Sequence, residues 1–173
     1  SAASDVYKRQ LDNIQKSYIK KESIYGPDNY KPLPVVLSKA KGVWVWDVND
    51  EKYIDMMSGY SAVSHGHAHP ELLKVFHEQS SRLSLTSRAF YTDTLGPYLE
   101  TITKMSKFEM CLPMNAGAEA VETAIKSSRR WAYRTKKVKP NKAEIIVAEG
   151  NFHGRTTTII SFSSDENSRG DFG

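Results

Sequence analysis

Two short apolar runs, separated by one long helical pattern, constrain the fold more than any other feature of this sequence. The runs are MCLPM at 110–114 and AEIIVAEG at 143–150. A continuous apolar run of this length is typical of a strand covered on both faces, and the order helix, strand, helix, strand indicates a parallel sheet. We therefore predict an α/β fold. Because parallel sheets usually have more than two strands, we expect the chain to be part of a larger domain.

The first 62 residues follow a different pattern. The first ten match nothing recognised and are expected to be a tail or the remnant of a targeting segment. A polar helix is predicted from about Leu11 to Ser23, followed by the proline-rich connector GPDNYKPLP. GVWVWDVNDEKYIDMM then predicts a β-hairpin with its turn at NDE. Trp44 and Trp46 share one face of that hairpin and are expected to pack in the core.

Helical patterns fill most of the second half. Pro70 stands where a first helical turn tolerates its missing N–H, and a stripe through Leu72, Phe76 and Leu83 is expected to be buried. A second helix is predicted after Leu95, ending near Ser106. The third begins in the stretch PMNAGAEAVETAIK at 113–126 and places an apolar face at Val121, Ala124, Ile125, Ser128 and Ala132.

Composition excludes several classes of protein. No window approaches the roughly 18 apolar residues of a membrane helix. Cys111 is the single cysteine, and no Asn-x-Ser/Thr sequon occurs. An intramolecular disulfide is thus impossible, which favours a reducing, intracellular setting.

The net charge of +4 raises the question of nucleic acid. The densest basic run, Lys126 to Lys139, occupies the back half of the third helix, whereas Glu119 and Glu122 lie at its front. Acid first and base last is the order that the helix dipole favours. Glu122 is also spaced for an i,i+4 pair with Lys126. We therefore expect no nucleic-acid partner.

The front of the third helix is a candidate anion site. A helix N-terminus offers unpaired N–H groups, and Gly117 lets a phosphate approach the backbone closely. The amides of Gly117 and Ala118 would then be the donors. The alternative is an ordinary helix with Asn115 as its N-cap. From this stretch alone, the capped helix is the more economical interpretation.

A second candidate is the loop GNFHGRT at 150–156, which directly follows an apolar run. Ligands of α/β folds bind at that edge. Phe152 can stack on a planar ring, and Arg155 can clamp a carboxylate in bidentate fashion. A surface loop with its arginine in solvent is the alternative.

Three alternating histidines, His65, His67 and His69, raise the question of a metal. Gly66 and Pro70 interrupt any regular element there, and no cysteine stands nearby in the sequence to complete a site. We therefore expect no metal.

Together these motifs resemble the class III, fold-type I aminotransferases, which use pyridoxal phosphate. More narrowly, YGPDNYKPLPVVL, KGVWVWDVNDEKYIDMMSGYSAV, GHAHPEL and LTSRAFY are similar to ornithine aminotransferases. The resemblance runs from about Tyr18 to Gly173. It implies that residues 1–62 contribute to a small domain and that residues 63–173 form the first part of the large, cofactor-binding domain. Acetylornithine and 4-aminobutyrate aminotransferases are the nearest alternatives.

The resemblance also implies roles for single residues. The segment Ala116, Gly117 and Ala118 matches the backbone that binds the cofactor phosphate, although relatives usually carry Thr or Ser where this chain has Ala116. Phe152 matches the aromatic residue that stacks on the pyridine ring. These matches favour the phosphate site over the ordinary capped helix.

On the substrate side, Arg155 matches the arginine that holds a substrate carboxylate, and Tyr30 matches a tyrosine that assists it. Tyr60 matches a tyrosine lining the pocket for the ornithine chain. The substrates implied are ornithine and 2-oxoglutarate, and the assembly implied is a homodimer or larger homo-oligomer without a membrane partner. A cytoplasmic location is expected, with the mitochondrial matrix as the alternative.

No catalytic residue of this family matches a position in the chain. The lysine that bonds to the cofactor is expected beyond Gly173, so we expect residues 1–173 alone to be inactive. A non-catalytic phosphate-binding module is the rival interpretation.

Overall fold

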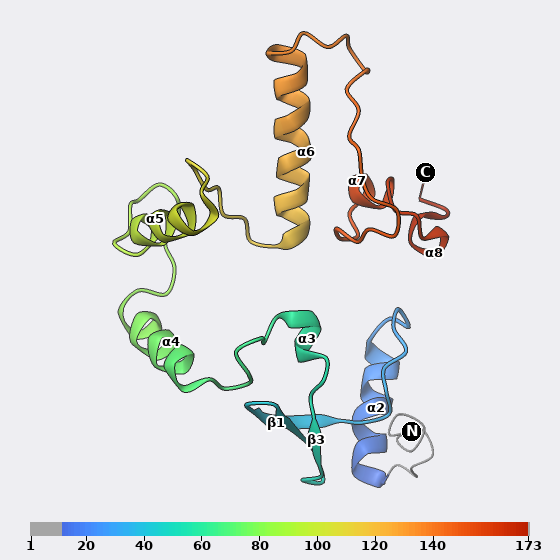
Figure 1. Cartoon of the computed structure of the whole chain (residues 1–173). Helices are drawn as coiled ribbons and strands as arrows, with labels where there is room; N and C mark the ends of the chain where they lie inside the picture. The colour runs from blue at the N-terminus through green and yellow to red at the C-terminus, as the bar shows by residue number, and fades with distance from the viewer. Residues whose placement is uncertain (1–11, 173) are drawn as a thin grey trace. The chain divides into compact units, whose positions relative to one another are not determined.

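A computed structural model describes residues 12–172 of the chain (Figure 1). The chain divides into two compact units, Ser1–Phe90 and Tyr91–Gly173. The expectation for residues 1–10 lies outside the described residues. The domain boundary expected at residue 62 concerns the domains of a complete enzyme and stays a prediction.

The first unit is built on a three-stranded antiparallel sheet in the order β1-β2-β3. The strands are β1 (Leu37–Lys41), β2 (Trp44–Asp47) and β3 (Lys52–Ile54). The central strand places Val45 opposite Ala40 on one side and Tyr53 on the other. The predicted hairpin is therefore confirmed, and β1, whose sequence LSKAK is mostly polar, adds a third strand to it.

The strand β2 buries Val45 and Asp47 rather than its tryptophans. Trp44 is 37% exposed, and the ammonium of Lys52 lies 3.7 Å from the centroid of its indole ring. The prediction that Trp44 and Trp46 pack in the core is wrong. Alternate side chains point to opposite faces of a strand, and the sheet turns the other face inward, leaving the indoles under lysine cations.

The buried carboxylate of Asp47 is the polar centre of this unit. It accepts hydrogen bonds from the side-chain amide of Gln15 at 3.2 Å and from the Tyr53 hydroxyl at 3.1 Å. The backbone amides of Asn49 and Glu51 donate to it at 2.9 and 3.0 Å. One side chain thus joins the first helix, the β2–β3 turn and β3.

The first helix, α2 (Asn13–Tyr25), is capped by Asp12, whose side chain accepts from the backbone amide of Gln15 at 2.8 Å. It is followed after the sheet by the short turn α3 (Ser58–Ser61) and by α4 (Pro70–Arg82). The start of α4 at Pro70 confirms the prediction.

The buried stripe predicted for α4 is wrong for this chain. Leu72, Phe76 and Leu83 are 54, 66 and 44% exposed, and α4 contains no buried residue. An apolar stripe is buried only when another element packs on it, and no described helix or strand makes an extensive contact with α4.

The second unit contains four helices among its described residues (Figure 1). These are α5 (Leu95–Ser106), α6 (Gly117–Arg134), α7 (Thr157–Ile160) and α8 (Glu166–Arg169). The predicted second and third helices are confirmed as α5 and α6. The small core of the unit lies where α7 meets α6 and consists of Ile125, Ile159 and Ile160.

The two apolar runs do not pair in this unit. Neither 110–114 nor 143–149 is a strand, and Ile145, Ile146 and Val147 are 44, 99 and 36% exposed. The parallel strands predicted there are therefore not formed within residues 12–172. A strand needs a neighbour to exchange backbone hydrogen bonds, and the described part of the chain provides none for either run.

Of the helices formed by residues 12–172, none has the length and apolar character needed to cross a membrane.

Candidate functional site

The helix α6 begins at Gly117. Its N-cap is Ala116, with φ −140° and ψ 160°, and not Asn115, the N-cap candidate of the alternative interpretation. The Ala120 amide donates to the Ala116 carbonyl at 3.0 Å, the first bond of the helix. The amides of residues 117–119 lie ahead of that bond and have no carbonyl partner within the helix.

Space and charge at this helix front favour an anion. A Cβ added to Gly117 would meet nothing within 4 Å, so the backbone can be approached closely. The helix dipole adds a partial positive charge. The exposed carboxylate of Glu119 accepts a hydrogen bond from the Ala116 amide at 3.1 Å, and its negative charge repels an anion. This side chain would have to move away for an anion to bind.

The loop at 150–156 is anchored at its beginning. The Gly150 amide donates to the Ser164 hydroxyl at 2.8 Å. The Asn151 side-chain amide donates to the carbonyls of Ala148 at 2.6 Å and Phe162 at 3.2 Å. The His153 ring lies edge-on to Phe162, with centroids 5.8 Å apart. These contacts fix the start of the loop to the segment that follows α7.

The end of the loop packs directly on α6. Gly154 has φ 130°, and a Cβ added to it would lie 2.9 Å from the Ala118 Cβ and 3.3 Å from Ile159 Cδ1. Two residues later, the Thr156 hydroxyl donates to the Glu122 carboxylate. The structure thus brings the Phe152–Arg155 loop to the same turn of α6 that offers the unpaired amides.

The two side chains predicted from this loop lie near each other. The guanidinium carbon of Arg155 is 5.7 Å from the centroid of the Phe152 ring, and Phe152 is 71% exposed. A large part of the phenyl ring is therefore available to another molecule.

The other two predicted residues, Tyr30 and Tyr60, belong to the first unit and are 55 and 84% exposed. Tyr60 has φ 56°, and its neighbours Ser58, Gly59 and Ser61 also have positive φ. A left-handed turn built mostly from non-glycine residues is strained, and such strain gathers at functional sites.

Residues 25–173, most of the chain, match the family model described as Aminotransferase class-III. The chain belongs to the class-III aminotransferases. Members of this family are enzymes that use pyridoxal phosphate.

Curated relatives and solved structures agree with this class-III assignment. An ornithine aminotransferase of Bacillus cereus is 54% identical over 91% of this chain and 40% of its own length. The crystal structure of the ornithine aminotransferase of Toxoplasma gondii is 38% identical, with a TM-score of 0.89, covering 99% of this chain and 40% of that one. An acetylornithine aminotransferase from Elizabethkingia anophelis is 53% identical, with a TM-score of 0.76 over 88% of this chain and 38% of its own.

The chain spans about 40% of the length of the curated relatives it matches. Its fold is that of the N-terminal portion of the fold-type I aminotransferases, which confirms the predicted fold class. The two apolar runs at 110–114 and 143–149 are not paired as strands in the described residues, but the assignment of the fold rests on the similarity to these aminotransferases.

The class-III cofactor fits the residues present. The unpaired amides and open space at the front of α6 suit a phosphate, and the exposed Phe152 ring offers a face to a pyridine. Ala116 supplies no hydroxyl to the phosphate. The residue pairing that sequence reasoning missed is Thr156 with Glu122, because helical spacing had assigned Glu122 to Lys126.

The histidine segment makes a different kind of contact. His67 Nε2 lies 2.7 Å from the Asp55 carboxylate. Hydrogen bonds from His67 and from the amides of Ser58 and Met57 lower the pKa of Asp55 below its ordinary value. Among residues 12–172, no group of three or more metal-binding side chains occurs.

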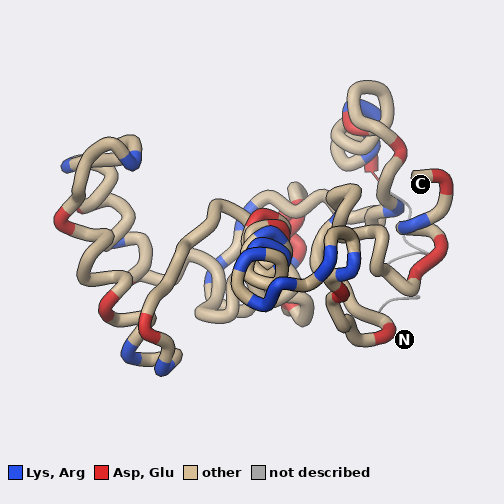
Figure 2. Tube along the Cα trace, turned by 90° about the horizontal axis from the view of Figure 1, so that it is seen from above, with Lys and Arg blue, Asp and Glu red and all other residues tan. Residues whose placement is uncertain are grey.

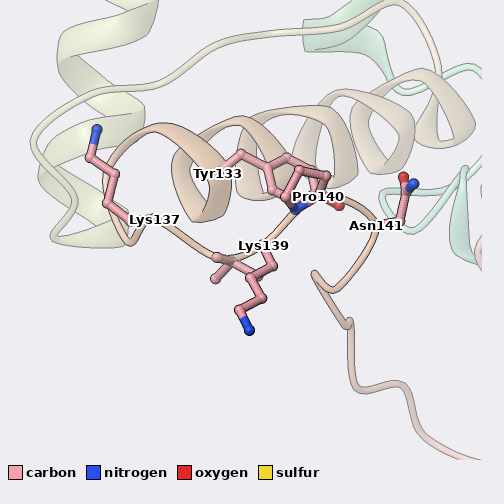
Figure 3. Close-up of a pocket in the computed structure, with 6 residues that line it drawn as sticks. Tyr133, Lys137, Lys139, Pro140 and Asn141 are labelled. Atoms are coloured by element: carbon pink, nitrogen blue, oxygen red, sulfur yellow. The ribbon is translucent and has the colours of Figure 1, made fainter.

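The far end of α6 carries the basic residues. Figure 2 looks down on α6 from its C-terminal end, where Lys and Arg gather. An open hollow of about 520 Å³ lies there (Figure 3), lined by Tyr133, Lys137, Val138, Lys139, Pro140 and Asn141. None of the predicted site residues lines this hollow, and the basic end is the arrangement that the helix dipole favours.

Proposed function

We propose that this chain is the front part of an ornithine aminotransferase. Such an enzyme transfers the δ-amino group of ornithine, leaving glutamate semialdehyde, and then passes the amine to 2-oxoglutarate to give glutamate. The observation that carries the proposal is the packing of Gly154 on Ala118, which brings the Phe152–Arg155 loop beside unpaired helix amides. The identity to curated ornithine aminotransferases supports the narrower assignment.

Within this proposal, bound pyridoxal phosphate supplies the electron sink and carries the amine between the two substrates. The amides of Gly117 and Ala118, with the backbone at Ala116, hold its phosphate. Phe152 stacks on its ring.

The remaining three residues hold the substrate. Arg155 pairs with the α-carboxylate of ornithine, and Tyr30 assists it. Tyr60 lines the pocket for the aliphatic chain. Anchoring the far end of ornithine in this way presents the δ-amine to the reacting centre.

A second candidate is acetylornithine aminotransferase, because a solved structure of that name is 53% identical to the chain. The two activities differ in whether the substrate's second amine is free or acetylated. An acetyl group removes a charge and adds bulk, so one pocket discriminates strongly between them.

The proposed assembly is a homodimer or larger homo-oligomer, and the proposed compartment is the cytoplasm, with the mitochondrial matrix as the alternative. A single cysteine, Cys111, suits a reducing compartment.

The test compares amine donors with a protein of the relatives' full length that carries this chain. We expect kcat/KM for ornithine to exceed that for N-acetylornithine, with 2-oxoglutarate as acceptor. The reverse order would establish the second candidate instead. Residues 1–173 alone should give no sustained transamination, and turnover by this chain would contradict the proposal.

A further inference from the structure

The loop 150–156 and helix α6 meet along one face of the helix. Ala118 and Glu122 are four residues apart and therefore lie on the same face, one turn from each other. Gly154 packs on Ala118, and Thr156 donates to Glu122. Between them stands Arg155, whose position is thus bounded by two contacts with α6.

The two contacts differ in what they contribute. The Gly154 contact is steric: it sets how closely the loop approaches but gives no direction along the helix. The Thr156 contact is directional, because a hydroxyl donating to a carboxylate fixes distance and angle together and is stronger than a bond between neutral groups. The pair therefore sets the register of the loop against the helix.

Among the described residues, the side chains of Glu122 and Thr156 make no other interaction that would explain them. Glu122 is half-buried on α6, and Lys126, its expected helical partner, makes no ion pair with it in the described structure. Thr156 is the N-cap of α7, yet its side chain makes no capping hydrogen bond. The hydroxyl that could have capped α7 is used to reach α6 instead.

We propose that Glu122 and Thr156 are positioning residues that hold Phe152 and Arg155 in register with the front of α6. The inference rests on the proposed function, since the register matters only if α6 and the loop bind one ligand together. The consequence is that the helix donating to the phosphate and the loop facing the ring behave as one preorganised site. Loss of the hydroxyl should loosen the loop without unfolding α6.

The experiment uses chain 1–173 with Thr156→Val, which keeps the shape of threonine without its hydroxyl, and Thr156→Ser, which keeps the hydroxyl. The first readout is amide hydrogen exchange of residues 151–156 in the absence of cofactor. We expect exchange in the valine variant to be about ten-fold faster, and the serine variant to remain near the wild-type rate. Exchange within α5 serves as the internal control and should not change.

The second readout is the dissociation constant for pyridoxal phosphate, followed by the change in its absorbance on binding. We expect about ten-fold weaker binding for Thr156→Val and for Glu122→Ala, with no further loss in the double variant. Equal exchange in the valine, serine and wild-type chains would overturn the inference, as would additive losses in the double variant. If the wild-type chain does not bind the cofactor, the phosphate site proposed at the front of α6 fails within this chain, while the exchange readout still tests the positioning pair.

Discussion

His67 Nε2 lies 2.7 Å from the Asp55 carboxylate, which also accepts from the amides of Met57 and Ser58 at 2.9 Å each. An ionised carboxylate can only accept, so the imidazole carries its proton on Nε2. Asp55 follows β3, and His67 bridges Gly42 next to β1 through backbone hydrogen bonds of 2.8 Å in both directions. This one carboxylate therefore ties the histidine segment to the sheet.

That contact predicts a pH dependence of stability. Because the pKa of Asp55 is lower in the folded chain, the stabilisation that this carboxylate gives is fully present above the ordinary pKa of 3.8. It is lost as pH falls through the lowered folded value. We expect Asp55→Asn to reduce the fall in the urea midpoint between pH 5 and pH 3. Asp28→Asn, at an exposed position in the connector, is the control. Equal acid slopes for wild type and Asp55→Asn would refute this assignment.

Asp47 predicts the largest loss of stability in the first unit. Replacing it with alanine removes the acceptor of the Gln15 side-chain amide and of two backbone amides, and one acceptor of the Tyr53 hydroxyl, which also donates to Glu51. We expect a loss of about 3 kcal/mol or more in the free energy of unfolding by urea. Asp50→Asn removes an exposed ion pair with Lys39 from the same turn and should cost less than about 1 kcal/mol. Similar losses for the two variants would contradict the role of Asp47 as the buried polar centre.

Gly154 and Gly96 form a matched pair in the second unit. In Gly154→Ala the new methyl group meets Ala118 at 2.9 Å, and φ 130° is unfavourable for alanine. We expect a loss of about 2–3 kcal/mol in stability. Gly96 lies in α5 with open space around it, so Gly96→Ala should stabilise the chain by up to about 1 kcal/mol. Thermal unfolding of both variants measures the difference, and tolerance of alanine at Gly154 would disprove the close packing.

Replacing Ala116 with threonine should increase both the stability of α6 and the affinity for pyridoxal phosphate. Ala116→Thr supplies a hydroxyl at the N-cap, where threonine is favoured, and should stabilise α6 by about 1 kcal/mol. In the proposed site the same hydroxyl reaches the phosphate, so affinity for pyridoxal phosphate should rise about five-fold. Ala116→Val has the same shape without the hydroxyl and should give neither gain. If valine raises affinity as much as threonine, the hydroxyl is not the cause.

Tyr60 tests the proposed substrate assignment. In an enzyme of the relatives' full length that carries this chain, Tyr60→Ile should lower the ratio of kcat/KM for ornithine to that for 4-aminobutyrate. A pocket built around a substrate discriminates through contacts that the competitor cannot make. An unchanged ratio would remove Tyr60 from the proposed pocket.

The sequence by itself determined the elements whose signals are local. The start of α4 at Pro70, the hairpin around its NDE turn, and the order of acid and base along α6 all follow from neighbouring residues. The candidate site residues came from motif resemblance, and their short sequence spacing already grouped those of α6 and those of the loop.

Tertiary structure alone decided which faces and side chains meet. In β2, the buried side chains are Val45 and Asp47 and not the tryptophans. Glu122 accepts a hydrogen bond from Thr156 instead of pairing with Lys126, and Gly154 packs against Ala118. Tertiary structure also left the apolar runs at 110–114 and 143–149 without partners among residues 12–172. The physical reason is range: turns, caps and helical periods depend on residues a few positions apart, whereas burial, register and hydrogen-bond partners depend on what the rest of the chain brings alongside.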